Sequence, residues 1–351
     1  MPVKTRLLLL GVLLALTVGL LAWRGLRRPA RPAAAPDASP GAAEPTHSAA
    51  TGGAATGSAP TERIVTGGAP TAGAPTAEAQ KIIDRFNGQR ALRDVEYQVG
   101  LGPRLPGSPA HRQLSEWLTG ELQASGWAVT VQETTALDQP VRNIIAEQGS
   151  GRPWVVIGAH YDSRMRADQD PDPAQHHQPV PGANDGASGV AVLAELGRVL
   201  PAGLPGSRYP RVTLVFFDAE DNGRIPGWDW ILGSRAYVAA LQDKPDAAVV
   251  IDMIGDADLN IYQERNSNPA LIEQIWSTAA RLGYEQFFIP SYNFTVLDDH
   301  IPFIEAGIPA VDLIDFNYPY WHTRQDTPDK VSAQSLQIVG RTLLSWLLET
   351  P

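Results

Sequence analysis

Apolar and polar positions alternate in a regular way along most of the chain from about residue 77 onward. Apolar residues recur every three or four positions in 77–100 and in 111–127, which predicts amphipathic helices. Residues 127–136 alternate between apolar and polar, and 141–149 follow after a short loop, which favours a β-hairpin or an antiparallel edge. Short, nearly continuous apolar runs then occupy 153–163, 211–221, 246–256 and 307–316.

Helical stretches separate these four apolar runs from one another. Strands that are covered by helices on both faces of a sheet have this apolar character. The pattern therefore predicts an α/β fold, a single globular domain with a central mixed, mostly parallel β-sheet flanked by helices.

The N-terminal segment 1–28 carries an uncharged apolar run from Leu7 to Trp23 with cations on both sides. Its length lies between that of a signal-peptide core and that of a membrane span. Arg24 and the arginines after it stand where a cleavage site would need small residues, which favours an uncleaved anchor over a signal peptide. A buried soluble helix is the less favoured interpretation. We expect the domain that follows to be extracytoplasmic, either anchored to the membrane or secreted after cleavage.

Residues 29–76 consist mainly of Ala, Pro, Gly, Ser and Thr. Such a segment has too little apolar surface to offset the entropy lost on ordering. We therefore expect a disordered linker at 29–76 and a folded domain at 77–351.

The charge and the cysteine count narrow the classes of function. The formal net charge is -10, although residues 1–32 hold six Lys or Arg and no acid, so the remainder is more acidic still. Nucleic acid is an unsuitable partner for such a chain, because phosphate binding needs clustered cations. Cysteine is absent, so disulfides and thiolate ligands are excluded and any metal must be held by His, Asp or Glu.

Chemically capable side chains recur where the predicted strands end. In open α/β sheets the ligand site lies beyond the carboxyl ends of the strands. The relevant residues are His160 after the first apolar run, Glu220 and Asp221 after the second, Asp252 in the third, His322 beyond the fourth, and Asp185 in a Gly-rich turn before a helix. One such histidine, or one Asp before a helix, is ordinarily structural. Their joint occurrence indicates a catalytic zinc site built from oxygen and imidazole ligands.

The neighbouring acids Glu220 and Asp221 suggest a division of labour. If Asp221 binds the metal, the cation offsets the crowding of negative charge, and Glu220 is free to act as general base and acid. Taken alone, this stretch is more typical of a solvated acidic loop. The Gly-rich turn at 182–189 lacks the Gly-Lys-Ser/Thr that a nucleotide-binding loop needs, so nucleotide is not expected as a ligand.

Together these segments resemble the zinc-dependent M28 peptidase family, most closely its glutaminyl-peptide cyclotransferase branch. The resemblance covers nearly everything from about residue 100 onward, through GPRLPGS, NIIA, AHYDS, GANDGASG, FFDAED, GSRAYV, DMIGD, DDHIPF and WHT. It implies that Asp185, Asp221 and His322 hold the zinc common to the family, and that Glu220 is the catalytic acid and base. Asp221 departs from the family pattern, in which this ligand is usually Glu.

The resemblance leaves two activities open. In two-zinc aminopeptidases of the family, the counterparts of His160 and Asp252 bind the second ion. In the cyclotransferases a single zinc is used, and the resemblance places Asp252 and Asp299 in a proton network. The cyclotransferase reaction, in which an N-terminal glutamine becomes pyroglutamate and ammonia is released, is the favoured hypothesis.

Aromatic residues favour the cyclotransferase branch, and one acidic residue opposes it. Trp321 precedes the metal-binding histidine, and Trp228 or Trp230 follows the acidic doublet, as the resemblance requires for a small substrate pocket. The pocket histidine of the branch is replaced by Asp312. A third hypothesis, an inactive M28-like binding module, is disfavoured because suitable side chains occupy all the ligand and acid–base positions.

Overall fold

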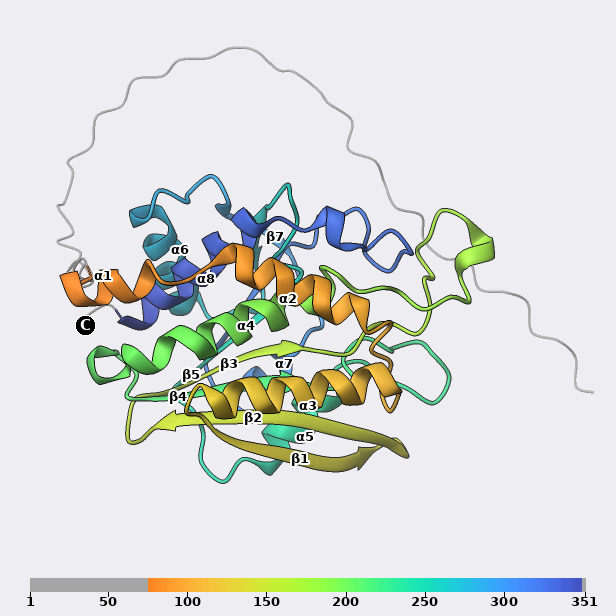
Figure 1. Cartoon of the computed structure of the whole chain (residues 1–351), viewed down its shortest axis with the longest axis horizontal. Helices are drawn as coiled ribbons and strands as arrows, with labels where there is room; N and C mark the ends of the chain where they lie inside the picture. The colour runs from red at the N-terminus through yellow and green to blue at the C-terminus, as the bar shows by residue number, and fades with distance from the viewer. Residues whose placement is uncertain (1–74, 349–351) are drawn as a thin grey trace, which may run out of the picture. The chain divides into compact units, whose positions relative to one another are not determined.

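The structure is a computed structural model that describes residues 75–348 of the chain (Figure 1). The predicted membrane segment at 1–28 and all but the last two residues of the predicted linker lie outside the described residues. Within 75–348, no helix is both long enough and apolar enough to cross a membrane.

A six-stranded sheet forms the centre of the described domain, with the spatial order β1-β2-β4-β3-β5-β8. The strands are β1 (Ala128–Ala136), β2 (Gln139–Gly149), β3 (Trp154–His160), β4 (Arg211–Phe217), β5 (Ala247–Asp252) and β8 (Ala310–Ile314). The last four run parallel, while β1 and β2 form an antiparallel hairpin that pairs with β4. The predicted mixed, mostly parallel sheet and the predicted hairpin are both confirmed. A smaller parallel pair consists of β6 (Ile261–Glu264) and β7 (Phe288–Phe294).

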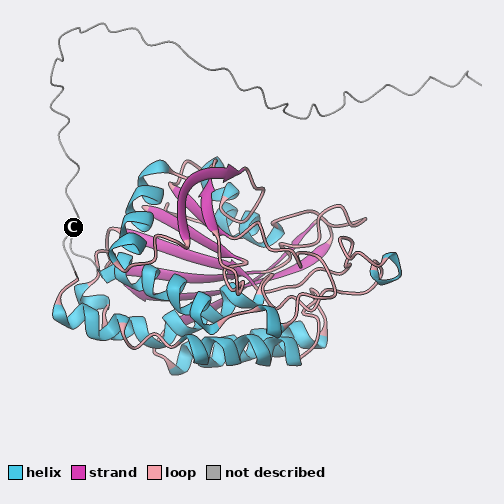
Figure 2. Ribbon diagram, turned by 90° about the horizontal axis from the view of Figure 1, so that it is seen from above, coloured by secondary structure: helices cyan, strands magenta, loops and turns pink. Residues whose placement is uncertain are grey.

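Helices cover both faces of the central sheet (Figure 2). They are α1 (Ala77–Ile83), α2 (Gly88–Gly100), α3 (Pro109–Ala124), α4 (Ala187–Val199), α5 (Leu232–Ala240), α6 (Pro269–Arg281), α7 (Ile301–Glu305) and α8 (Ala333–Leu348). Short 3₁₀ turns lie at Pro173–Gln175, Leu200–Ala202, Leu204–Gly206 and Pro328–Lys330. Ile157 and Leu214 pack on the face that carries α2, α4 and α8. Val156 and Val215 point to the other face, where they pack with residues of α5 and α7.

This double coverage explains why the parallel strands read as continuous apolar runs. All seven residues of β3 are buried, as are all six of β5. Because successive side chains of a strand point to opposite faces, a strand covered on both sides needs apolar residues at every position. Each fully buried Val, Leu or Ile contributes about 1.5–3 kcal/mol, so these runs supply much of the stability of the fold.

The helical pattern predicted over 77–100 is divided in the structure. Helix α1 ends at Ile83, and α2 begins at Gly88. Asn87 has an extended backbone, and its side chain accepts a hydrogen bond from the backbone N–H of Arg90, which caps the second helix. The apolar spacing continues through this break, so the prediction of one uninterrupted helix is wrong because the cap starts a new one.

Strand register brings the ends of the parallel strands to one edge of the sheet. His160 at the end of β3 pairs with Phe217 at the end of β4. Asp252 at the end of β5 pairs with Ile314 at the end of β8. Loops that leave these four strands therefore begin side by side, which is where the sequence predicts a site.

Candidate metal centre

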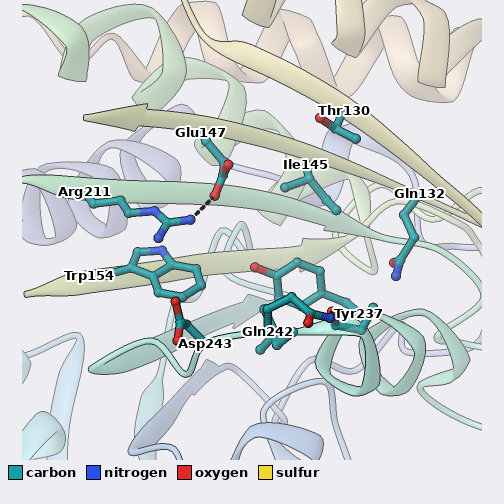
Figure 3. A pocket seen from close by; sticks show the side chains of 11 residues that line it. Thr130, Gln132, Ile145, Glu147, Trp154, Arg211, Tyr237, Gln242 and Asp243 are labelled. Carbon is teal, nitrogen blue, oxygen red and sulfur yellow. Dashed lines mark hydrogen bonds and ion pairs between the residues drawn. The ribbon is translucent and has the colours of Figure 1, made fainter. Parts of the chain in front are cut away.

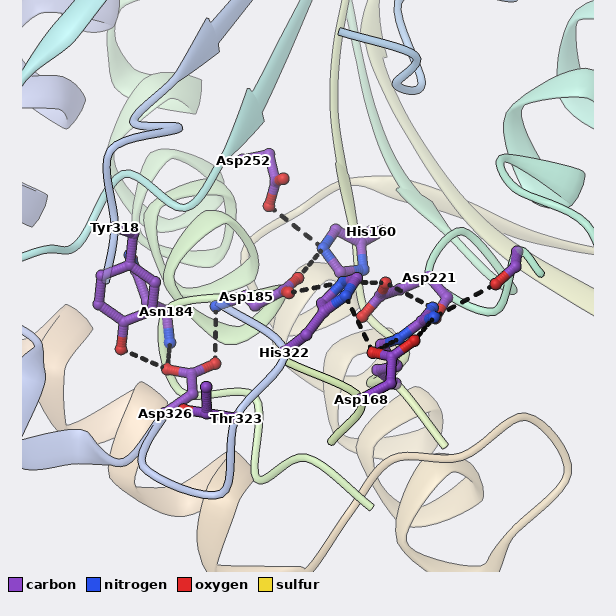
Figure 4. A network of polar contacts seen from close by, with 12 residues as sticks. His160, Asp168, Asn184, Asp185, Asp221, Asp252, Tyr318, His322, Thr323 and Asp326 are labelled. Atoms are coloured by element: carbon purple, nitrogen blue, oxygen red, sulfur yellow. Dashed lines mark hydrogen bonds and ion pairs between the residues drawn. The ribbon is translucent and has the colours of Figure 1, made fainter. Parts of the chain in front are cut away.

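The five predicted metal ligands lie together beyond the carboxyl ends of the parallel strands (Figure 4). We call this group the metal centre, and it comprises His160, Asp185, Asp221, Asp252 and His322. His160 and Asp252 are the last residues of β3 and β5, and Asp185 lies two positions before α4. Asp221 follows β4, and His322 lies between β8 and α8. All five side chains are buried.

The metal centre consists of two triads that share Asp185. In one triad, His160 Nε2 lies 3.2 Å from Asp185 Oδ1 and 3.2 Å from Asp252 Oδ1. In the other, His322 Nε2 lies 2.9 Å from Asp221 Oδ1 and 3.8 Å from Asp185 Oδ2. Asp185 therefore directs one oxygen toward each histidine, an arrangement in which one carboxylate can bridge two cations.

The side chains present fit a zinc ion. The Oδ2 atoms of Asp185 and Asp221 are buried without a hydrogen-bond partner, and a buried anionic oxygen is costly unless a cation or a donor approaches it. Imidazole and carboxylate ligands without thiolate are typical of catalytic zinc sites, in which three protein groups bind and a further position stays open. The shorter Asp221 side chain still reaches His322. The triads offer enough ligands for one ion or for two.

Two further carboxylates contact the Nδ1 atoms of the histidines, on the side away from the triads. Asp162 Oδ1 lies 3.4 Å from His160 Nδ1, and Asp168 Oδ1 lies 3.4 Å from His322 Nδ1. Carboxylates in this position fix the tautomer and ring orientation of a metal-binding histidine and raise its basicity. The sequence analysis assigned no role to either residue. The His-x-Asp spacing at 160–162 could have suggested the first, whereas nothing in the sequence links Asp168 to a histidine 154 residues later.

The backbone of the turn that carries Asp185 is held in place by the side chain of Asp326. Asp326 accepts hydrogen bonds from the backbone N–H groups of Asn184 and Asp185 at 2.8 and 3.2 Å. The hydroxyl of Tyr318 donates to the same carboxylate at 2.7 Å. Gly186 follows with φ 90°, and a Cβ there would approach the backbone oxygen of Asp162 to 2.7 Å. The turn that presents Asp185 therefore requires glycine at this position.

Burial and mutual repulsion shift the pKa values of the metal centre. Burial raises the pKa of Asp221 to about 6, and the charge of Asp185 adds to the effect. Burial also raises the pKa of Asp252 to about 7, although His160 opposes it. Burial lowers the pKa of His322, but Asp221 and Asp168 outweigh it and raise the pKa to about 9. The centre therefore retains protons near neutral pH, and a divalent cation must compete with them.

Glu220 is buried beside the metal centre without belonging to either triad. Burial raises its pKa well above the ordinary value, His160 opposes this shift, and the neighbouring charge of Asp221 reinforces it. A carboxyl group whose pKa is raised in this way holds a proton more readily than an ordinary carboxylate, which suits a group that must accept a proton and return it. The structure leaves Glu220 outside both triads, and the division between a metal ligand and a proton carrier stays a prediction.

Glu220 faces a cavity of about 240 Å³ that opens onto the metal centre. Trp230 and Trp321 line this cavity, as predicted, together with Phe316 and Asp298. Outside the lining lie two predicted pocket residues, Trp228 and Asp312, and also Asp299, which was predicted as part of the proton network. Trp228 packs against Val141, Ala219 and Leu232, while Asp299 and Asp312 are buried outside the lining.

Three residues of the site hold backbone conformations that side chains ordinarily avoid. Ala219, just before Glu220, has φ 53°, and Met253, just after Asp252, has φ 47°. His322 itself has φ 55°. Left-handed conformations at non-glycine residues cost on the order of 1–3 kcal/mol each and cluster at functional sites. These three conformations lower the free energy of unfolding, and they direct the neighbouring side chains toward the metal centre.

A second hollow of about 300 Å³ lies between α5 and the strands β1, β2, β3 and β4 (Figure 3). The guanidinium of Arg211 stacks over Trp154 at 4.0 Å and pairs with Glu147 at 2.7 Å. The lining of this hollow contains no histidine. It therefore provides no counterpart of the metal centre.

The family pattern of peptidase M28 matches residues 143–347, which include all five side chains of the metal centre. The chain therefore belongs to the peptidase M28 family, as the motifs had predicted.

Solved structures of known proteins extend this relationship. The chain is 33% identical to the glutaminyl cyclase of Tannerella forsythia, with a TM-score of 0.71, and the match covers 76% of this chain and 99% of the other. It is 32% identical to a Zn-dependent exopeptidase of Parabacteroides distasonis, with a TM-score of 0.69 and coverage of 74% and 97%. Among curated relatives, a glutaminyl-peptide cyclotransferase of Boiga irregularis is 26% identical over 290 residues, which cover 70% of this chain and 77% of the relative. The sequence identity and structural similarity of this chain to a cyclase and to an exopeptidase are therefore nearly equal.

Proposed function

We propose that this protein is a zinc-dependent glutaminyl-peptide cyclotransferase that converts an N-terminal glutamine into pyroglutamate and releases ammonia. The observation that carries the proposal is the cavity at the metal centre. It is small, Trp230 and Trp321 line it, and Glu220 is the acid beside the triads that neither triad uses. Relatives named glutaminyl cyclase in the comparisons support the same assignment.

The residues of the cavity divide the work as follows. A zinc ion held by Asp185, Asp221 and His322 would polarise the side-chain amide of the bound glutamine. Glu220 accepts a proton from the α-amino group as the nitrogen forms its bond to the amide carbon. The same carboxyl group then returns that proton to the departing amide nitrogen, which leaves as ammonia. The indole walls exclude water, which would otherwise compete with the α-amino group.

The carboxyl groups of Asp252 and Asp298 line the same cavity. A free peptide N-terminus is protonated in neutral water, and it gives that proton to the solvent before the neutral amine attacks. Carboxyl oxygens of these two residues can accept hydrogen bonds from the α-amino group of the substrate and orient it, whereas an internal glutamine has no free amino group. This arrangement of hydrogen-bond acceptors favours a substrate with a free N-terminus.

One observation favours a second candidate function. Asp185 turns one oxygen toward each of two complete triads, and two metals bridged in this way would suit an aminopeptidase that removes the first residue by hydrolysis. Glu220 would then accept a proton from the attacking water. The alternative uses the same side chains, so only the reaction product and the metal requirement distinguish them.

The decisive experiment follows the fate of two peptides that differ in their first residue. Zinc-loaded protein is incubated with a Gln-initiated and a Leu-initiated peptide, and the products are weighed by mass spectrometry. Loss of ammonia from the Gln peptide without shortening is expected, with no change in the Leu peptide. Release of the first residue from either peptide would overturn the proposal in favour of the aminopeptidase.

Metal analysis of a His160→Ala variant gives an independent answer. If one ion suffices, the variant should retain as much zinc as the wild type after dialysis against a weak chelator, because Asp185, Asp221 and His322 remain. A drop of about one ion per chain would show that His160 holds a second metal.

A further inference from the structure

A second group of buried histidine and acidic side chains lies outside the metal centre. We call Asp298, His300 and Asp312 the inner cluster, in which one potential ligand atom from each residue lies within 4.8 Å of the other two. Asp298 and His300 lie between β7 and α7, and Asp312 is the middle residue of β8. The exposed fractions are 3% for Asp298 and 0% for the other two.

Glu264 at the end of β6 fixes one side of His300. Its carboxylate accepts hydrogen bonds from the backbone of Asn266 and Ser267 at 2.8 Å each, from Ser267 Oγ at 2.9 Å and from Val296 at 3.1 Å. Burial raises the pKa of Glu264, but His300 and these donors outweigh it and lower the pKa below its ordinary value. Glu264 therefore stays ionised in the folded protein. His300 Nε2 lies 3.2 Å from its Oε2.

The other ring nitrogen of His300 faces the acids of the inner cluster. His300 Nδ1 lies 3.7 Å from Asp312 Oδ2. Neither oxygen of Asp312 has a hydrogen-bond partner, and Asp298 Oδ2 and both ring nitrogens of His300 also lack one. When the imidazole carries its proton on Nε2, the nitrogen that faces Glu264, the lone pair on Nδ1 and these carboxylate oxygens face one another in a buried space. Either a proton or a metal cation among them relieves this repulsion, and a metal cation can contact all three side chains at once.

We propose that the inner cluster is a second cation site that binds a divalent transition metal through Asp298, His300 and Asp312, separate from the metal centre. A carboxylate that receives the distal N–H of a metal-binding histidine is a regular feature of such sites, and Glu264 occupies that position. Two carboxylates and an imidazole match the ligand preference of zinc. Because Asp298 also lines the cavity, an ion here would hold that part of the cavity wall in place.

The test uses the full chain with zinc as the probe. Wild-type and Asp312→Asn proteins are loaded with zinc and dialysed against a weak chelator, and their zinc content is measured by mass spectrometry of the elements. The variant should lose about one ion per chain, because Asn keeps the size of the side chain but removes an anionic ligand. Asp315→Asn, three residues farther along and equally buried, is the matched control and should retain the wild-type content.

Anomalous scattering at the zinc edge locates the ion in wild-type crystals and does not depend on the folding of any variant. A peak between Asp298, His300 and Asp312 is expected in addition to density at the metal centre. Absence of that peak in zinc-loaded crystals, or equal zinc content in wild type and Asp312→Asn, would overturn the proposal and assign the buried position to a proton on His300. Neither result bears on the peptide reaction, which is measured separately.

Discussion

The metal centre and the inner cluster are built from the same kinds of side chain, yet the fold treats them differently. Both combine histidine with aspartates, and a carboxylate lies behind a histidine in each. The metal centre draws its members from the ends of parallel strands and from the loops beyond them, and it opens onto a cavity. The inner cluster takes Asp312 from within a strand, and only Asp298 reaches the cavity wall. Ligand chemistry alone therefore does not define an active site, because access for a substrate must accompany it.

The largest effect is expected from Glu220, the acid that lines the cavity at the metal centre. Glu220→Gln keeps the size of the side chain but removes the proton acceptor, so turnover should fall by about 10²–10⁴-fold. Zinc content should stay at the wild-type level because Glu220 belongs to neither triad. Steady-state rates and metal analysis measure the two quantities. Glu285→Gln, at an exposed position, serves as the control, and wild-type turnover in Glu220→Gln would remove Glu220 from the mechanism.

A smaller effect is expected from the carboxylate behind His322. Asp168→Asn should weaken zinc binding at the metal centre by about 10–100-fold, because the histidine loses the anion that orients it. Competition with a chromophoric chelator gives the affinity. Asp172→Asn changes an exposed acid of the same loop and should leave the affinity unchanged. Equal affinities in the two variants would show that Asp168 serves only its pairing with Arg164.

The framework of the inner cluster is tested by removing one hydroxyl group. Ser267 Oγ donates to Glu264 and accepts the backbone N–H of Asp312 at 3.0 Å, so Ser267→Ala breaks two buried hydrogen bonds. The free energy of unfolding should fall by about 1–3 kcal/mol, as measured by urea denaturation. Ser150→Ala, at an exposed serine, should change it little. A stability equal to wild type in Ser267→Ala would mean that these contacts do not hold the cluster.

The smallest effect concerns a buried acid outside both groups. Burial raises the pKa of Asp315 to about 7, although the backbone N–H groups of Asn260 and Asn317 oppose the shift. Between about pH 4 and pH 7 the folded chain therefore holds a proton that the unfolded chain has released, so stability falls as pH rises through this window. Asp315→Asn should show a flatter dependence of Tm on pH, by a few degrees between pH 5 and pH 8. Parallel curves for the two proteins would place the Asp315 pKa at its ordinary value.

Much of the fold could be predicted because burial leaves a direct trace in the sequence. Strands covered on both faces read as apolar runs, and the ligands of the metal centre stand at or after the ends of those runs. The break before Gly88 was not predicted, because the cap acts through one side chain while the apolar spacing continues. An apolar pattern reports which face is buried, but it does not report where a helix is interrupted.

The less predictable residues depend on how distant loops close. Asp168 reaches His322 and Asp326 reaches Asp185 only after the loops around the centre have packed, and no local spacing encodes those distances. Asp312 could be noticed as a departure from the family pattern, but its pairing with His300 needs β8 and the segment before α7 to lie together. No sequence pattern predicted a role for Glu264. Its partners Val296 and His300 lie more than 30 residues later in the chain, and only the folded structure brings them together.

Two indole rings lie against His322. The ring of Trp321 is centred 3.8 Å from the imidazole and that of Trp230 6.0 Å from it, and both are stacked on it. A protonated imidazole quenches the fluorescence of an adjacent indole, and exchange of that proton for a metal ion changes the emission. The protein therefore carries its own optical reporter of metal loading, readable by titration without any added label.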